Sequence, residues 1–260
     1  MFFAMGAGCL FAQKGFNVQV AVQPGASFLS GDWKISNGSG TDYTFKKSFT
    51  FGFEGGVNAG YNFTDNLGVS IGMFYASQGQ NYKDLVVADG YMTGTLKNDI
   101  SLSYLKIPLR FVFNTNPENS LSFTGFAGFY LGFLTGYKQT MSYSGTGASS
   151  GEYKLVMKGN TRTETYNSSS DQYVLVGKPF KSTNFGITLG AGVQKKLLEK
   201  LFLQIMLNYQ MGFGDVKNVA SQYRDSNDKL EDVYASDDPN RSVSHKNSEL
   251  GLMIGLKKSF

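Results

Sequence analysis

The last eleven residues, Leu250–Phe260, alternate between two kinds of side chain and read LGLMIGLKKSF. Five large apolar side chains share one parity: Leu250, Leu252, Ile254, Leu256 and Phe260. Because successive side chains of a strand point to opposite faces, this run predicts a β-strand with one apolar face and one small or polar face. Lys258 is the one misfit on the apolar side, and it stands where a long side chain reaches an interface. A soluble domain rarely ends on so regular a strand with an unprotected edge, so we expect this strand to close a barrel on the first strand.

The composition is rich in glycine and aromatic residues, with Gly 32, Phe 22 and Tyr 15 against only 17% charged residues. Aromatic side chains favour pleated, half-buried surfaces, and glycine suits tight turns and a crowded barrel interior. No apolar stretch reaches the roughly 18 residues that a transmembrane helix needs. The formal net charge of +4 is mild and no long run of like charges occurs, so nucleic-acid binding is not expected.

The first twelve residues, 1–12 (MFFAMGAGCLFA), resemble the apolar core and cleavage site of a secretory signal peptide. We expect cleavage before Gln13, so that residues 13–260 form one β-barrel domain. The only cysteine, Cys9, lies in this leader. The mature chain would then have no thiol for a disulfide, a thiolate metal site or a cysteine nucleophile. The alternatives are a disordered or membrane-associated tail, and lipidation of Cys9.

Alternation of the same kind recurs along the chain and predicts seven further strands. They lie at residues 16–22, 49–63, 67–75, 99–113, 121–133, 185–193 and 201–213. Pro24 is expected to bend or end the first strand, since proline has no N–H for a ladder. In the fourth strand the apolar parity changes near Tyr104 and Leu105, which predicts a bulge. Pro108 in the same strand needs a bulge or a missing ladder bond.

The connections between these strands alternate in length. Tight turns follow the second, fourth and sixth strands, at residues 64–66, 114–119 and 197–200, whereas long polar segments follow the others. The largest polar segment, 138–181, contains Tyr153, Leu155 and Met157, which indicate a hairpin within it. One end of the structure therefore collects every long loop. This asymmetry predicts an all-β fold, an eight-stranded antiparallel up-and-down transmembrane β-barrel with long extracellular loops and short periplasmic turns.

A barrel with an apolar core and water outside, as in a lipocalin, would give the same alternation. The polar parity here carries mainly Gly, Ser, Thr, Asn and Gln, whereas a water-exposed sheet would normally show frequent Lys and Glu. Small uncharged side chains suit the packed interior of an eight-stranded barrel, and aromatic residues near strand ends suit interfacial girdles. The lipocalin-like element Gly31-Asp32-Trp33 falls in a polar segment, where we interpret it as a chance match.

Two strands carry a resemblance to the PorT-like outer-membrane β-barrel family of Gram-negative bacteria. One resembles the family's Y-L-x-I-P-L strand through Tyr104, Leu105, Ile107, Pro108 and Leu109. The other, residues 185–193 (FGITLGAGV), resembles its F-G-x-x-x-G-A-G-V strand. The likeness extends over most of the mature chain, although its motifs are structural. It implies the outer membrane of a Gram-negative bacterium as the location after export. Because named members act in type IX protein secretion and gliding motility, it also implies a secretion-associated role.

Four charged residues are expected to face the barrel interior: Glu54, Lys106, Arg110 and Glu249. Unpaired charges are costly in a low-dielectric interior, so the two carboxylates should pair with the lysine or the arginine. Such a salt-bridge plug could gate a narrow pore. The alternative is a static, packed interior, since eight strands leave room only for side chains.

The sole histidine, His245, lies near Ser242, Ser244 and Glu249 in the sequence. A serine, histidine and carboxylate at a barrel mouth could hydrolyse lipid A acyl chains, which makes a lipid-modifying enzyme one alternative. Neighbouring residues in a polar loop are easily obtained by accident, so we expect no enzymatic activity. No phosphate loop, zinc spacing or calcium-loop pattern occurs, so no cofactor and no metal are expected.

The sequence therefore predicts a monomeric, non-enzymatic barrel whose surface loops, above all 138–181 and 215–246, form a binding platform. Its expected partners are outer-membrane lipid and lipopolysaccharide, the barrel-assembly machinery, and a secretion-machinery or extracellular protein that contacts the loops. A small gated pore is the alternative function. Phe260, in phase with Leu256 and Ile254, is expected to be the C-terminal signal for barrel assembly.

Overall fold

The computed structural model describes residues 14–36, 42–88, 93–115, 119–145, 151–234 and 238–260. This part contains sixteen strands, and every pairing between them is antiparallel, which confirms the predicted all-β antiparallel fold. The predicted leader, residues 1–12 with Cys9, lies outside the described residues. In the described part, no helix is long and apolar enough to cross a membrane.

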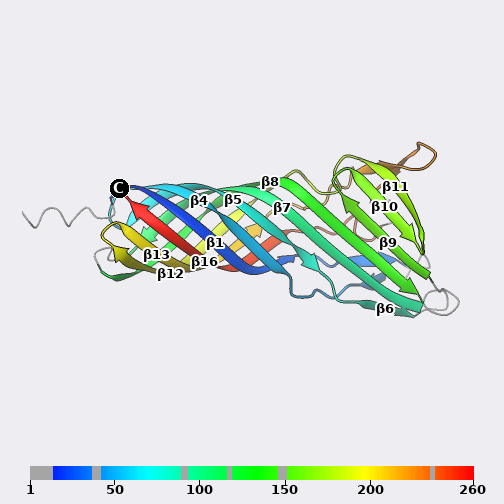
Figure 1. Cartoon of the computed structure of the whole chain (residues 1–260), viewed down its shortest axis with the longest axis horizontal. Helices are drawn as coiled ribbons and strands as arrows, with labels where there is room; N and C mark the ends of the chain where they lie inside the picture. Colours follow the sequence, from blue (N-terminus) through cyan, green and yellow to red (C-terminus); the bar gives the residue numbers. More distant parts are fainter. Residues whose placement is uncertain (1–13, 37–41, 89–92, 116–118, 146–150, 235–237) are drawn as a thin grey trace, which may run out of the picture.

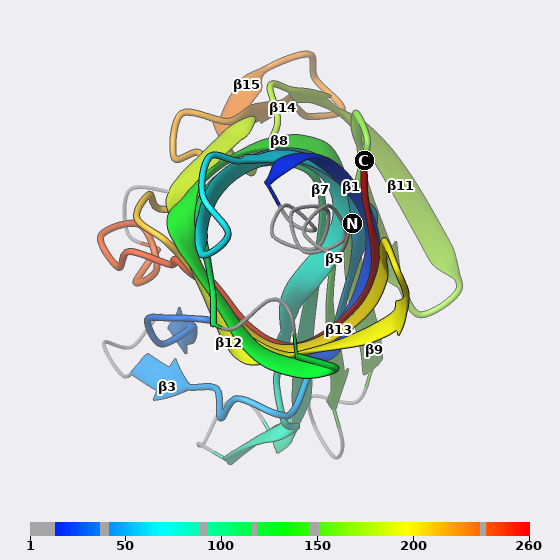
Figure 2. The ribbon, with the colours of Figure 1, turned by 90° about the vertical axis from the view of Figure 1, so that its left-hand side faces the viewer.

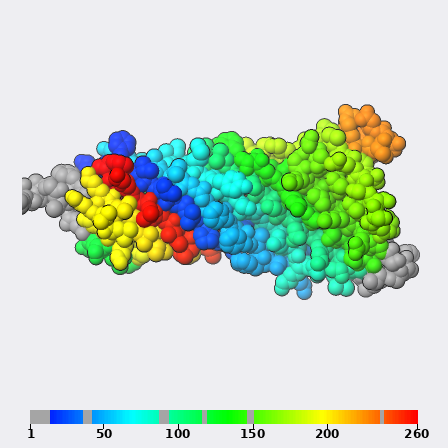
Figure 3. Space-filling view, in the orientation of Figure 1, coloured from blue at the N-terminus to red at the C-terminus, as the bar shows by residue number. Residues whose placement is uncertain are grey.

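Eight of the strands pair one after another and return to the first, and we call them the ring (Figure 2). In order they are β1 (Gly15–Leu29), β4 (Phe51–Asn62), β5 (Leu67–Asn81), β7 (Thr93–Asn114), β8 (Leu121–Gly145), β12 (Thr183–Leu198), β13 (Leu201–Gly212) and β16 (Asn247–Ser259). The last strand, β16, pairs with β1 from Asn17↔Ser259 to Leu29↔Asn247. The C-terminus and the turn between β12 and β13 lie at one end of the elongated molecule (Figures 1 and 3).

Most large apolar side chains of the ring point outward, and the side chains that point inward are mainly polar or small. On β1, Phe16, Val18 and Val20 are exposed, whereas Asn17 and Gln19 are buried. The same alternation runs along β16, where the leucines point outward and the glycines inward. The predicted assignment of the two faces is thus confirmed. An outer surface made of large apolar side chains is costly to leave in water and requires a non-aqueous or protein neighbour.

Strand β1 runs through Pro24, which corrects the expectation that this proline bends or ends the first strand. Pro24 pairs with Phe53 of β4, whereas the pairs with β16 stop at Val22 and resume at Gly25. The ladder on the β16 side omits the position that has no N–H to donate, and the strand continues on either side.

The bulge predicted in β7 lies on its neighbour β8 instead. The β7–β8 register shifts between Ser103 and Tyr104, and the extra residue, Thr135, belongs to β8. On β7 itself the even-numbered side chains, Tyr104 and Lys106 among them, point inward without a break. The apolar parity changes because the interior changes from apolar to polar at this level. Pro108 is accommodated as predicted, by missing ladder pairs, since neither Pro108 nor Ile107 pairs with β5.

The long connections fold into strands, which corrects the prediction of exposed polar loops. β9 (Gly151–Lys158), β10 (Thr161–Tyr166) and β11 (Ser169–Val176) continue the sheet from β8, and β14 (Gln222–Arg224) and β15 (Leu230–Asp232) extend it. β2 (Lys34–Ser36) pairs with β3 (Asp42–Thr44), and β6 (Leu85–Ala88) pairs with β7. The hairpin indicated around Tyr153 and Met157 is therefore present as part of a larger meander (Figure 1).

The folded connections share one buried apolar cluster, which we call the cap, at the end of the ring opposite the C-terminus. Its buried members are Leu29, Trp33, Phe45, Tyr82, Leu96, Ile100, Leu102, Tyr104, Leu134, Tyr137, Met157, Leu175, Phe180, Val216 and Tyr234. Members such as Trp33, Phe180 and Val216 stand singly in polar segments of the sequence, so no local periodicity marks them. Ile100, Leu102 and Tyr104, in contrast, follow the alternation of β7. Trp33, whose surroundings in the sequence are polar, is buried here.

Candidate functional site

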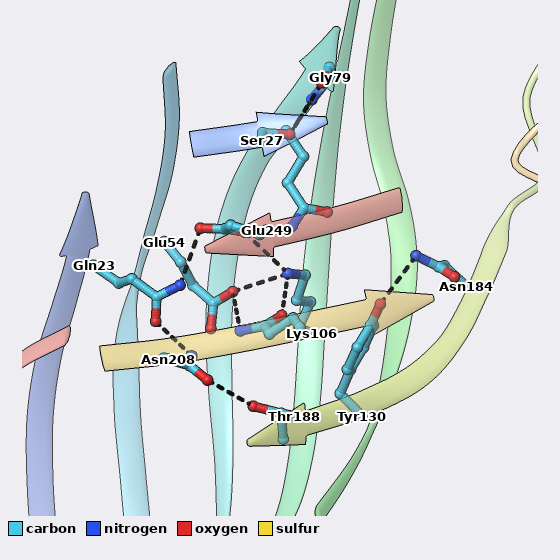
Figure 4. Close-up of polar contacts among 12 residues, drawn as sticks. Gln23, Ser27, Glu54, Gly79, Lys106, Tyr130, Asn184, Thr188, Asn208 and Glu249 are labelled. Atoms are coloured by element: carbon cyan, nitrogen blue, oxygen red, sulfur yellow. Dashed lines mark hydrogen bonds and ion pairs between the residues drawn. The ribbon is translucent and has the colours of Figure 1, made fainter. Parts of the chain in front are cut away.

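The ring interior contains a buried lysine, Lys106 of β7, whose side chain is 1% exposed. Its Nζ lies 2.9 Å from Oε2 of Glu54 on β4 and 3.5 Å from Oε2 of Glu249 on β16 (Figure 4). Gln210 of β13 accepts a hydrogen bond from this Nζ and donates one of 3.0 Å to Glu54 Oε2. We call these four residues the plug. Three of the four interior charges predicted from the sequence are thus brought together.

The Glu249 carboxylate is held by two amides besides the lysine. Gln23 donates to Oε1 over 3.1 Å, and Gln78 donates to Oε2. Asn208 in turn donates to Gln23 Oε1, and Thr188 donates to Asn208 Oδ1 over 3.1 Å (Figure 4). All five side chains are buried. Because these groups are bonded to one another across the ring, the network fixes their positions and fills the interior at this level.

Arg110, the fourth predicted interior charge, lies outside the plug. Its guanidinium carbon is 4.4 Å from the centre of the Phe126 ring and 5.2 Å from that of Phe74. In the part of the chain that the structure describes, it forms no ion pair, and its Nε has no hydrogen-bond partner. The two predicted cations therefore have different surroundings, one paired and one placed between aromatic rings.

The predicted set of serine, histidine and carboxylate is not assembled. Glu249 points into the ring interior, whereas the His245 ring lies against Trp33 of the cap. Nδ1 of His245 is 3.0 Å from the carbonyl oxygen of Val243, so a backbone group rather than a carboxylate orients the imidazole. Burial and the nearby Lys217 ammonium lower the pKa of His245 to about 4. The imidazole is therefore neutral near pH 7.

The remaining predicted residues lie in the ring. Leu109 of the family motif is exposed on the outer face of β7, and Leu105 and Ile107 share its parity. Phe260, the predicted assembly signal, is 61% exposed, and its backbone N–H donates to the carbonyl oxygen of Phe16. These residues have structural roles in forming and closing the sheet.

A groove that sequence reasoning missed lies where β8 changes its neighbour. β8 pairs with β12 up to Phe133 and with β9 from Lys138 onward, which leaves a short unpaired stretch. The groove there has a volume of about 580 Å³. Its walls include Leu134, Tyr137, Leu175, Lys138, Lys158 and Lys178. The three lysines are far apart in the sequence, and only the meander brings them together.

No metal site is evident in the described ranges, where no three His, Cys, Asp or Glu side chains gather in a suitable arrangement.

The chain belongs to the family of the outer membrane protein β-barrel domain, whose family model matches residues 11–218. The protein is therefore located in the outer membrane, as predicted. No curated protein matches the chain.

Several solved outer-membrane proteins are similar at low identity. Neisserial surface protein A (NspA) is 14% identical, and the match covers 95% of this chain and 98% of that chain with a TM-score of 0.40. OprG from Pseudomonas aeruginosa is 12% identical, with 95% and 97% covered and a TM-score of 0.45. The outer membrane protease OmpT from Escherichia coli is 10% identical, with 95% and 97% covered and a TM-score of 0.47.

Proposed function

We propose that the protein is a monomeric eight-stranded transmembrane β-barrel without enzymatic activity, whose outer end binds the phosphorylated lipid of the outer leaflet, lipopolysaccharide. The eight strands of the ring cross the membrane, the short turns face the periplasm, and the cap stands outside. The observation that carries the proposal is the three-lysine groove and its level on the ring.

The groove begins where the apolar belt of the ring ends. On β8 the outward side chains from Leu121 to Phe133 are all apolar or glycine. The next exposed positions on this strand are Thr135 and Lys138. Lipid headgroups lie at the edge of the apolar belt of a barrel, so the groove stands at their level.

The groove combines charge with an apolar wall. None of its lining residues is acidic, and among the described residues none of its three lysines forms an ion pair. Lys138 and Lys158 pair directly across the β8–β9 ladder, an arrangement that is destabilising for like charges. A phosphate group between them would relieve that repulsion, because ammonium groups bind phosphate as point charges. Leu134 and Leu175 offer the apolar contact that a lipid also needs.

The test compares two lipids in native mass spectrometry of the detergent-purified protein. Lipid A with its phosphates should bind, and dephosphorylated lipid A should bind at least about tenfold more weakly. The variant Lys138→Gln/Lys158→Gln/Lys178→Gln should lose the preference. Its matched control, Lys195→Gln/Lys196→Gln/Lys200→Gln, removes the same charge at the opposite end of the ring and should keep it. A preference unchanged in the groove variant would refute lipid binding at this groove.

The alternative of a small gated pore is opposed by the filled interior. The plug occupies the ring at the level of Lys106, and the cap fills the level beyond it. In planar bilayers neither the wild type nor Glu54→Ala should show channels. A conductance in the wild type that changes with Glu54→Ala would support the gate instead.

The absence of enzymatic activity is supported by the separation of His245 from Glu249, one in the cap and the other in the plug. The lipid A mass spectrum of cells should therefore be the same with and without the gene. A change in acyl chains on deletion would support the lipid-modifying alternative.

Membership of the PorT-type branch, with a role in type IX secretion, is a narrower proposal. It is supported by the motif strands that begin at Tyr104 and Phe185, which lie in β7 and β12. Affinity purification from outer membranes tests it. Co-purifying secretion subunits would support the branch assignment, and their absence would favour a self-contained barrel.

A further inference from the structure

Two buried cations line one small cavity in the ring, between the plug and the C-terminal end. Arg110 is 2% exposed and Lys257 is 4% exposed, and both border a cavity of about 30 Å³. Lys257 points inward from β16, and its neighbour Lys258 points outward. We propose that this cavity binds a small monovalent inorganic anion of the chloride class between Arg110 and Lys257.

The charge balance of the interior calls for one anion. The buried charged side chains of the ring are the cations Lys106, Arg110 and Lys257 and the carboxylates Glu54 and Glu249. Three positive charges against two negative ones leave one positive charge uncompensated. Both carboxylates are bonded to Lys106, and no acidic residue lines the cavity. An uncompensated buried charge is destabilising, and a single bound monovalent anion would offset it.

The donors around the cavity are free to bind such an anion. The aromatic rings of Phe74 and Phe126 lie by the Arg110 guanidinium, and contacts of this kind use ring faces rather than hydrogen bonds. Arg110 Nε has no hydrogen-bond partner among the described residues, and neither does the Thr124 hydroxyl, which also borders the cavity. Within the same part of the chain, Lys257 forms no ion pair. Donors from Arg110, Lys257 and Thr124 therefore border one space, whose lining also includes one acceptor without a partner among the described residues, Asn58 Oδ1.

The size of the cavity selects the class of anion. A site for one water molecule needs about 10–15 Å³ measured in the same way, so about 30 Å³ suits a monatomic anion or one anion with a water. Several surrounding amides are bonded to one another, as in the hydrogen bond of 2.8 Å from Asn58 Nδ2 to Gln19 and that of 2.6 Å from Gln19 to Gln204. They hold the walls in place and leave no room for a lipid phosphate.

Bromide is a chloride analogue with an anomalous X-ray signal, so crystals of the full chain soaked in sodium bromide give a direct test. An anomalous peak should lie between Arg110 and Lys257 in the wild type. It should be lost in Lys257→Gln and kept in Lys258→Gln, which removes the same charge from the outer face. A cavity without a bromide peak, or peaks on the outer surface only, would overturn the proposal.

Thermal unfolding in detergent gives a second test. At equal ionic strength the wild type should melt about 2–4 °C higher in chloride than in gluconate, because ligand binding stabilises the folded state. Lys258→Gln should keep this difference, and Lys257→Gln should abolish it. If Lys257→Gln does not fold, the wild-type comparison still decides, since equal melting temperatures in the two salts would exclude a bound chloride.

Discussion

The ring of His245 lies 4.7 Å from the ring of Trp33, measured between centroids, and these are the chain's only histidine and only tryptophan. Trp33 follows β1, and His245 precedes β16. The backbone N–H of His245 donates to Asp215 Oδ1 over 3.1 Å, which ties a third segment to the same place. The fluorescence of Trp33 can therefore report both the protonation of His245 and the integrity of the cap.

The cap should loosen in acid through His245. Its folded pKa is about 4, below the ordinary value of 6.5, because burial and Lys217 oppose the charged form. The unfolded state therefore binds the proton more readily, so this contribution to stability is complete above about pH 6.5 and is lost as the pH falls towards 4. Trp33 emission, recorded from pH 7 to pH 3, should change with a midpoint near pH 4.

The variant His245→Gln is the control for this titration. Carboxylates such as Asp215 face the same site, so a change of emission in acid does not by itself identify the imidazole as its cause. The glutamine variant keeps them and removes only the imidazole. Its emission should stay flat over the same pH range. A transition of equal size in the variant would mean that the imidazole is not its cause.

A methyl group at Gly128 should be poorly tolerated. Gly128 pairs with Arg110 across the β7–β8 ladder, and a Cβ there would stand 2.1 Å from the carbonyl oxygen of Leu109. That oxygen belongs to the backbone, so relief requires a shift of β7, and overpacking of this kind costs about 1–3 kcal/mol. Gly128→Ala should lower the urea midpoint of unfolding in lipid vesicles.

Gly136 on the same strand is the matched control. A Cβ at Gly136 would meet only the Ser103 side chain at 3.8 Å, which is ordinary contact. Gly136→Ala should therefore leave the midpoint unchanged or raise it slightly, because alanine restricts the unfolded chain. Equal losses in the two variants would mean that strand flexibility, and not the close approach at Gly128, sets the cost.

Much of the ring follows from the sequence because period-2 alternation is a local signal. The run from Phe51 to Asn62 forms a strand, and its apolar parity faces outward, as its residues alone predict. The proline positions show the limit of that signal. Pro24 and Pro108 are tolerated because one neighbouring ladder omits two pairs at each proline, and the omission depends on the neighbouring strand.

The residues of the candidate site also differ in whether a local sequence signal predicts their surroundings. Parity places three charged residues on the polar face of their strands, where few other charged residues occur: Glu54, Lys106 and Glu249. Their burial and their pairing could therefore be predicted. The surroundings of Arg110 depend on its contact with Phe126 of β8. The parity of a single strand does not reveal such a contact between strands. The cap and the three-lysine groove depend on how long connections fold over one another. Cap residues from those connections, such as Trp33, Phe180 and Val216, have no apolar periodicity around them. The alternation of β16 places Lys257 on the inner face, but the surplus positive charge becomes evident only when the other interior charges are known.

The ring of Phe260 should matter for assembly more than for the finished fold. Its side chain is exposed, and its backbone bond to Phe16 does not need the aromatic ring. Phe260→Ala should therefore reduce the yield of protein in the outer membrane but leave the melting temperature of the assembled fraction within about 2 °C, as expected for a surface change. Phe63→Ala, an exposed phenylalanine elsewhere in the chain, serves as the control and should keep a normal yield. An unchanged yield in Phe260→Ala would contradict the signal assignment.

Removal of the plug's only cation should be the most damaging single change in the interior. Lys106→Met leaves the carboxylates of Glu54 and Glu249 buried without their ammonium, which costs about 3–5 kcal/mol. The exposed pair of Lys97 and Asp84, 3.4 Å apart, provides the control, since Lys97→Met should cost at most about 1 kcal/mol. Urea unfolding in vesicles measures both. The triple variant Glu54→Gln/Lys106→Met/Glu249→Gln should recover part of the loss, because it removes the unpaired charges as well. If Lys106→Met lost no more stability than Lys97→Met, the carboxylates would have to be protonated or hydrated, and the plug would not be an ionic one.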